Sequence, residues 1–168
     1  MKGKLSVEVA PSFYLHLSLL LIILPLPCVV SVVSAAFLHE IFHILALRIF
    51  HIEMTRIELR SSGAYISTRS LTPLEQIVCA SAGPLGGLLA ASVLRTFPRF
   101  AFCAFVQSVY NLIPFLSFDG GKILKGICAC LPEKVGDLIS YTVKTLAIIL
   151  LITSIVLLTF YVKVINCG

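Results

Sequence analysis

The sequence predicts an all-α, multi-pass membrane protein: a bundle of about six transmembrane helices with one small β-hairpin. Hydrophobic residues make up 58% of the 168-residue chain and charged residues 12%, whereas soluble domains have roughly 25% charged residues. The mean hydropathy is +1.03. Apolar runs of about 20 residues, the length that crosses a bilayer, alternate with short polar links.

The basic residues behind the net charge of +5 are scattered near the ends of apolar segments, where they set membrane topology and contact lipid headgroups. No basic cluster with interleaved aromatic residues occurs, so we expect the lipid bilayer and not nucleic acid as a partner. Cys128 and Cys130 lack the second cysteine pair that a structural zinc site needs. Five or six spans leave no room for a soluble regulatory or PDZ domain, so we expect residues 1–168 to form a single membrane-embedded domain.

Residues 11–52 are almost uninterrupted in their apolar character, which is length enough for two crossings. Pro25 and Pro27 mark the break between them, because proline interrupts a helix interior. We therefore predict helices at about 11–25 and 29–51.

Residues 52–70 change to an alternation of polar and apolar residues, with a turn at Ser61-Ser62-Gly63. A period of two with a glycine-containing turn is typical of a β-hairpin. We place this hairpin at or just outside the membrane surface. Its edge offers a place where an extended peptide can add as a further strand.

Thr72 and Glu75 are typical of a helix start and open a predicted helix at 73–95. Within it, Gly83 and Gly87 form a GxxxG pair, which predicts a surface for close helix packing. This helix is therefore expected to lie tightly against a neighbour.

Three further segments follow: a helix at 100–116, a short apolar piece at 121–131 and a last helix at 138–162. The short piece either crosses the membrane, giving six spans, or is re-entrant, giving five. Basic residues near helix ends lie mostly on the side of the N-terminus, with Arg95 and Arg99 on the other side. We therefore expect the N-terminus and the hairpin to face the cytoplasm.

The most informative motif is His39-Glu40-Ile41-Phe42-His43, which lies inside the second predicted helix. An HExxH pattern is expected by chance about 0.003 times in a chain of this composition. Four residues apart, His39 and His43 share one helix face, so both can reach one tetrahedral zinc ion beside Glu40. Ionisable groups within a membrane helix cost about 2.5–3.5 kcal/mol each and need a functional reason. The motif therefore predicts a metal-dependent peptide hydrolase.

A catalytic zinc site has three protein ligands and one open position, so one ligand beyond the histidines is required. Asp119 is the best placed, because the second and fourth predicted helices run in the same direction and bring it towards the lower half of the second. Glu75 is the second choice. The other anionic or imidazole candidates are Glu53, Glu58, His16 and His51.

Taken together, the motifs resemble those of the site-2 protease family of intramembrane metalloproteases. That family has an HExxH in its second core helix, a small-residue Gly-Pro motif in the next, and an N-x-x-P followed by Leu/Phe-Asp-Gly in the one after. This chain has, in the same order, His39 to His43, Ser81-Ala82-Gly83-Pro84-Leu85, Asn111 with Pro114, and Phe118-Asp119-Gly120. The resemblance covers residues 4–126 and is nearest to the compact bacterial branch that includes the stage IV sporulation protease acting on a sigma-factor precursor.

The resemblance implies one Zn²⁺ per chain, held by His39, His43 and Asp119. Glu40 would then be the catalytic base and acid. The Asn111 amide would help to stabilise the oxyanion; alternatively, it satisfies backbone groups freed by the nearby proline.

The implied substrate is a membrane protein with a transmembrane or membrane-tethered segment, such as a sporulation sigma-factor precursor or an anti-sigma factor. The resemblance also implies a bacterial cell membrane, an active site facing the cytoplasm, and room for an inhibitory membrane partner.

Other functions stay open at this point. An HExxH membrane protease of the prenyl-endopeptidase type would use a glutamate as its third ligand. In an inactive relative, histidine and glutamate would hydrogen-bond within the bundle without catalysis. A metal transporter would use the histidines as a transit site, but it would be expected to line several helices with ligands.

Overall fold

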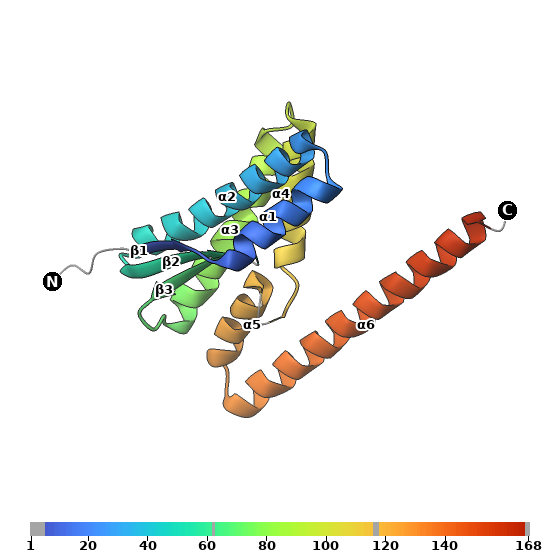
Figure 1. The fold of residues 1–168 in the computed structure, drawn as a ribbon. Coiled ribbons are helices and arrows are strands. Elements are labelled where there is room, and N and C mark those ends of the chain that lie inside the picture. The colour runs from blue at the N-terminus through green and yellow to red at the C-terminus, as the bar shows by residue number, and fades with distance from the viewer. Residues whose placement is uncertain (1–5, 62, 116–117, 167–168) are drawn as a thin grey trace.

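The computed structural model describes residues 6–61, 63–115 and 118–166, with side chains as far as Ser154. These residues form six helices and three strands (Figure 1). In chain order the elements are β1 (Ser6–Val9), α1 (Pro11–Ile23), α2 (Leu26–Ile49), β2 (Met54–Arg60), β3 (Gly63–Thr68), α3 (Pro73–Val93), α4 (Pro98–Asn111), α5 (Asp119–Ala129) and α6 (Glu133–Asn166). The predicted mostly helical fold with one hairpin is confirmed.

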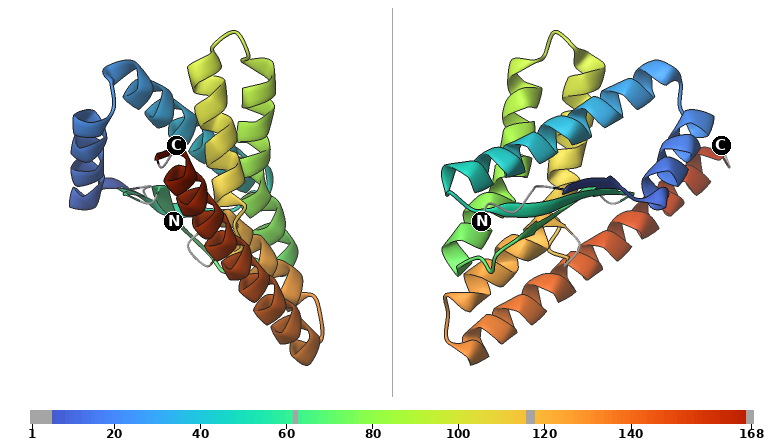
Figure 2. Two further views of the ribbon diagram at one scale, coloured as in Figure 1. Left: turned by 90° about the vertical axis from the view of Figure 1, so that its right-hand side faces the viewer. Right: turned by 60° about the vertical axis from the view of Figure 1, so that its left-hand side comes forward.

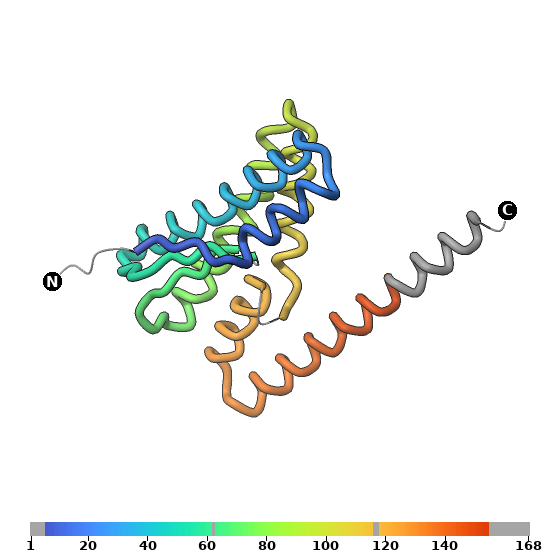
Figure 3. The backbone as a smooth tube through the Cα atoms, in the orientation of Figure 1, coloured from blue at the N-terminus to red at the C-terminus, as the bar shows by residue number. Residues whose placement is uncertain are grey.

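The first two helices, α1 and α2, form the predicted pair and run in opposite directions (Figure 3). Pro25 has an extended backbone, and α2 begins directly after it at Leu26 rather than at residue 29. Pro27 is tolerated there, because the first helical turn has no intrahelical partner for an N–H. The chain leaves α2 through His51, whose φ of 52° is a left-handed conformation typical of helix ends.

The hairpin, β2 and β3, gains a third strand that the sequence did not predict. β1 pairs in parallel with β2, with Val7 opposite Ile57, so the strand order is β1-β2-β3. β1 has only four residues, and its partner lies far away in the chain. No local sequence pattern therefore predicts this pairing.

One face of β2 carries charged side chains at every second residue. Arg56 pairs with Glu8 of β1 at 2.6 Å, and Arg60 pairs with Glu58 at 2.9 Å. The hydrogen bond from Arg60 keeps the pKa of the Glu58 carboxyl below its ordinary value, so this residue is ionised at neutral pH. Such a face belongs against water or lipid headgroups rather than acyl chains.

The third helix, α3, begins with the capping box that Thr72 and Glu75 predict. Figure 2 shows α3 and α4 side by side, and they pack closely. A Cβ atom on Gly87 would lie 2.2 Å from the Ser108 Oγ of α4, so the predicted close packing is confirmed at this glycine. α4 ends at Asn111 rather than at 116, because Pro114 disfavours the helical conformation in the residue before it.

The last two helices differ from each other in length and packing. α5 has 11 residues, and α6 begins at Glu133 rather than at 138, because the Pro132 carbonyl accepts the N–H groups of Val135 and Gly136. α6 contacts α5 and extends away from the other helices (Figure 1).

Three helices of the described chain, α2, α3 and α6, are long and apolar enough to cross a membrane. The other three have 13, 14 and 11 residues, or about 20, 21 and 17 Å, which is short of a hydrocarbon core of about 30 Å. Length and composition thus support three of the predicted spans within the described chain. α4 is short because its helix ends inside an apolar run, ahead of Pro114.

The burial pattern of α2 differs from that of a helix in a water-soluble protein. α2 buries His39 and His43, while Phe37 is 68% exposed and Ile49 is 65% exposed. Polar residues inside and large apolar residues outside suit a lipid environment. Together with the three apolar helices, this pattern indicates a membrane protein.

Candidate metal centre

Two histidines of α2 and one aspartate of α5 form a buried cluster. The Nε2 atoms of His39 and His43 are 3.1 Å apart, and each lies 3.0 Å from Oδ2 of Asp119. The three residues are 3%, 9% and 5% exposed, in that order. Among the described residues, this is the one group of His, Cys, Asp or Glu whose ligand atoms converge as a metal site requires. The structure thus brings together the three ligands expected from the sequence.

Local structure explains the position of each member. His39 and His43 lie four residues apart on one face of α2. Asp119 is the first residue of α5, where the helix dipole favours a negative charge. Its other oxygen, Oδ1, accepts a hydrogen bond of 2.9 Å from Lys122 Nζ one turn later. Lys122 therefore holds the carboxylate with Oδ2 directed at the histidines.

The hydrogen bonds of His43 identify an atom that is free to bind a metal ion. Nδ1 of His43 lies 2.7 Å from the Cys79 carbonyl oxygen, which only accepts, so Nδ1 carries a proton. In the neutral imidazole Nε2 then has a lone pair, and it faces the lone pairs of Asp119 Oδ2 at 3.0 Å. Two such atoms repel each other unless a metal cation or a proton lies between them. The donor set therefore fits a metal ion.

The spacing of the donor atoms also fits zinc. Atoms at about 2.0–2.1 Å from a tetrahedral zinc ion lie about 3.3–3.4 Å apart. The separations of 3.0 to 3.1 Å among the three donors reach this value with small side-chain movements. Two imidazole nitrogens, one carboxylate oxygen and an open fourth position are typical of a catalytic zinc site.

Gly83 of α3 leaves the space that the cluster occupies. A Cβ atom on Gly83 would lie 2.2 Å from Nε2 of His43 and 2.7 Å from Nε2 of His39. The GxxxG spacing predicts a packing surface for both of its glycines, but the structure gives them different neighbours: Gly87 faces α4 and Gly83 faces the candidate metal-binding atoms.

Replacing Gly83 by alanine should lower zinc affinity by at least about 10-fold, because both histidines have to move away from the added methyl group. Gly87→Ala is the matched control, since it makes the same change one turn later against Ser108. It should lower the unfolding midpoint while zinc content stays at the parental value. Zinc content and thermal unfolding of both purified variants in detergent check this prediction. Equal zinc affinity in Gly83→Ala and the parent would contradict it.

Asn111 and Glu40, the two expected catalytic residues, lie beside the cluster. Asn111 ends α4 and places its Nδ2 atom 3.4 Å from His39 Nε2. The Oε1 atom of Glu40 accepts a hydrogen bond of 3.1 Å from the backbone N–H of Ala64 in β3.

This contact places the hairpin turn along the length of α2. Glu40 lies about 14 Å along the α2 axis from its last residue, Ile49. The hairpin turn therefore lies beside α2 and not beyond its end. The carboxylate of Glu40 provides the physical reason, because it accepts a backbone N–H that β2 does not use.

The other ligand candidates lie elsewhere. Glu75 accepts hydrogen bonds of 3.0 and 2.6 Å from Arg69 and caps α3, and Glu58 pairs with Arg60 on the sheet. Neither belongs to the cluster. Within the described chain, the cluster also excludes Glu53, His16 and His51.

Two parts of the site were not expected from the sequence. Lys122 follows Asp119 by three residues, and this i, i+3 spacing at a helix start was a usable signal for a cation beside the carboxylate. The Ala64 N–H is a backbone group in a distant strand, and no side-chain pattern indicates its contact with Glu40.

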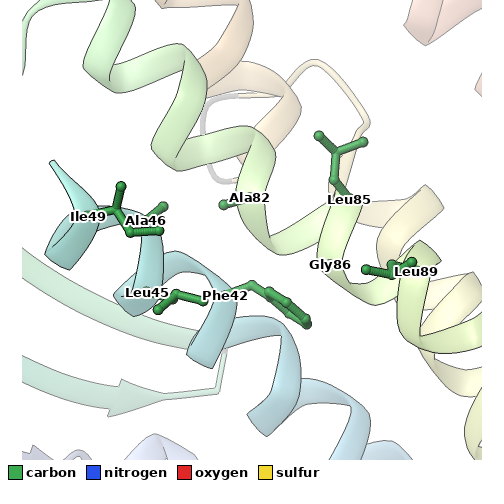
Figure 4. Close-up of a pocket in the computed structure, with 8 residues that line it drawn as sticks. All are labelled: Phe42, Leu45, Ala46, Ile49, Ala82, Leu85, Gly86 and Leu89. Atoms are coloured by element: carbon green, nitrogen blue, oxygen red, sulfur yellow. The ribbon is translucent and has the colours of Figure 1, made fainter. Parts of the chain in front are cut away.

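An apolar groove with a volume of about 280 Å³ runs between α2 and α3 beside the site (Figure 4). None of the three metal-binding candidates lines it. It is lined by Phe42, Leu45, Ala46, Ile49, Ala82, Leu85, Gly86 and Leu89. Such a surface suits acyl chains and offers no group for catalysis.

No protein-family model matches the sequence, and no curated protein matches it significantly. Among solved structures, the fold is similar to that of the site-2 protease from Methanocaldococcus jannaschii. The TM-score is 0.63 at 20% sequence identity, and the alignment covers 92% of this chain and 82% of that one. At this identity the similarity establishes the fold alone. The chain therefore has the fold of a site-2 protease.

Proposed function

We propose that this protein is an intramembrane zinc metalloprotease of the site-2 protease type, which hydrolyses a peptide bond in or near a membrane-spanning segment of another protein. The main support is the buried cluster of His39, His43 and Asp119, with Glu40 beside it on α2. The site-2 protease fold adds to it.

The residues of the site have separate roles in the proposed hydrolysis. Bound zinc would supply a Lewis acid that activates the attacking water and polarises the scissile carbonyl. Glu40 takes a proton from that water and delivers it to the leaving amine nitrogen. Its Oε1 atom is held by the Ala64 N–H, which leaves Oε2 for the transfer. The Asn111 amide lies beside His39, where it can donate a hydrogen bond to the developing oxyanion.

The open edge of the sheet can hold an unwound substrate. The peptide groups of a transmembrane helix are hydrogen-bonded to each other, so the substrate has to unwind before attack. In the described residues β2 is the central strand, and β1 and β3 are the two edge strands. Of these, β3 begins beside Glu40, so a substrate strand is expected to pair with β3.

We propose further that the substrate is a membrane-tethered regulator, such as a sporulation sigma-factor precursor or an anti-sigma factor, and that an inhibitory membrane partner restrains the enzyme. The support for this class is the order of the sequence motifs. The resemblance favours a bacterial cell membrane, and the basic residues near the N-terminal side favour an active site that faces the cytoplasm.

Removal of zinc tests the proposed chemistry. The chelator o-phenanthroline should abolish cleavage of a single-span membrane protein by the purified protein in liposomes, and added Zn²⁺ should restore it. The isomer m-phenanthroline, which does not chelate, is the control and should leave cleavage intact. Gel analysis of the products measures the effect. Undiminished cleavage by protein shown to be free of metal would contradict the proposal.

A further inference from the structure

The turn of the hairpin touches the side chain of Glu40 at two points. Oε1 of Glu40 accepts a hydrogen bond of 3.1 Å from the Ala64 N–H, the one hydrogen bond that this side chain makes among the described residues. A Cβ atom on Gly63 would lie 2.8 Å from the same oxygen. Gly63 also has φ of +114°, a conformation that other residues rarely adopt. The turn therefore fits closely against the carboxylate.

The sheet does not need the amide that Glu40 binds. Leu59, the partner of Ala64 across the hairpin, directs its carbonyl away from β3 and accepts the N–H of Ala10 at 2.9 Å. Leu59 and Ala64 are thus a pair whose backbone groups face away from each other. The Ala64 N–H points out of the sheet and can bind Glu40 without loss of a ladder hydrogen bond.

We infer that the turn at Gly63–Ala64 is a positioning element for the catalytic glutamate. A glutamate has three side-chain torsions, and catalysis requires its carboxylate to be held in one orientation. The Ala64 N–H fixes Oε1, and the bare Cα of Gly63 leaves room for it. The strand that offers its edge to the substrate and the residue that moves the proton are thereby joined by one hydrogen bond. The inference rests on the proposed function, because the reaction gives Glu40 its role.

Amide hydrogen exchange tests the hydrogen bond itself. In protein labelled with ¹⁵N-alanine, the Ala64 amide should exchange at least about 10-fold faster in Glu40→Ala than in the parent, because its acceptor is gone. Other alanine amides in α2 and α3 serve as internal references and should keep their rates. Unchanged exchange at Ala64 would overturn the inference, and this readout needs no proteolysis.

Kinetics test the positioning role. Ala64→Pro removes this N–H and should lower kcat about 10-fold or more, a part of the roughly 10²–10⁴-fold that a general base contributes, while KM and zinc content stay at parental values. Thr68→Pro removes an amide that faces the same way farther along β3, by strand alternation. It should raise KM and leave kcat near the parental value.

The two experiments separate this inference from the proposed function. If the parent cleaves substrate and Ala64→Pro retains its kcat, the positioning role is wrong and the proposed protease function is supported. If the parent cleaves nothing while the exchange rate of the Ala64 amide depends on Glu40, the hydrogen bond is confirmed and the proposed protease function is wrong. Should Ala64→Pro fail to fold, Gly63→Ala crowds the same oxygen and is expected to give the same loss of kcat.

Discussion

Replacing Asp119 by alanine should remove zinc from the protein and abolish proteolysis. Its Oδ2 atom lies 3.0 Å from both histidine nitrogens, and no other carboxylate of the described chain joins the cluster. Loss of an outer-shell partner costs about 10–100-fold in metal affinity, so loss of a direct ligand should cost more than about 100-fold. Titration of the metal-free protein with Zn²⁺ against a competing chelator measures the change.

Glu75→Ala is the matched control, because Glu75 is the alternative third ligand. It should keep zinc and activity, since Arg69 and the start of α3 already engage this carboxylate. Loss of zinc from Glu75→Ala, with zinc retained by Asp119→Ala, would instead favour an HExxH protease with a glutamate ligand.

Replacing Glu40 by glutamine should leave one zinc ion per chain and lower kcat by about 10²–10⁴-fold. Glutamine keeps an oxygen for the Ala64 N–H and nearly the same shape, but it cannot take a proton from water. Single-turnover cleavage, with zinc content measured on the same sample, checks this result.

The control for Glu40→Gln is Glu133→Gln, the same change at an exposed residue in the first turn of α6. Its rate and its zinc content should equal those of the parent. A Glu40→Gln variant that retains its zinc and keeps its rate would mean that another group acts as the base. An inactive relative would show no difference between these proteins, because none of them would cleave.

Local chemistry made much of the fold predictable. Pro25 marked the break between α1 and α2, and Thr72 marked the start of α3. The alternation after Ile52 predicted the hairpin, because successive side chains of a strand point to opposite faces and so repeat every two residues. The prediction that His39 and His43 share one helix face required only their spacing of four residues, so it did not depend on any tertiary contact.

Features that depend on contacts between distant segments could not be predicted in the same way. The pairing of β1 with β2 joins short segments that carry no mutual signal. The role of Gly83 depends on which helix lies opposite, so its spacing alone predicted packing and missed the metal-binding atoms. The contact between the hairpin turn and α2 depends on a backbone hydrogen bond to Glu40, which no side-chain pattern indicates. The ends of helices inside apolar runs were also misplaced, as at α4, because apolar composition continues through turns.

The position of the cleaved bond tests most directly whether the protein cleaves substrates within the membrane. Membrane-tethered candidate substrates would be co-expressed with the parent or with Glu40→Gln, and the new termini mapped by mass spectrometry. We expect termini in or near the membrane-spanning segment of at least one candidate with the parent, and none with the variant. If the parent and Glu40→Gln process every candidate alike, the protein is not the protease that its metal centre indicates.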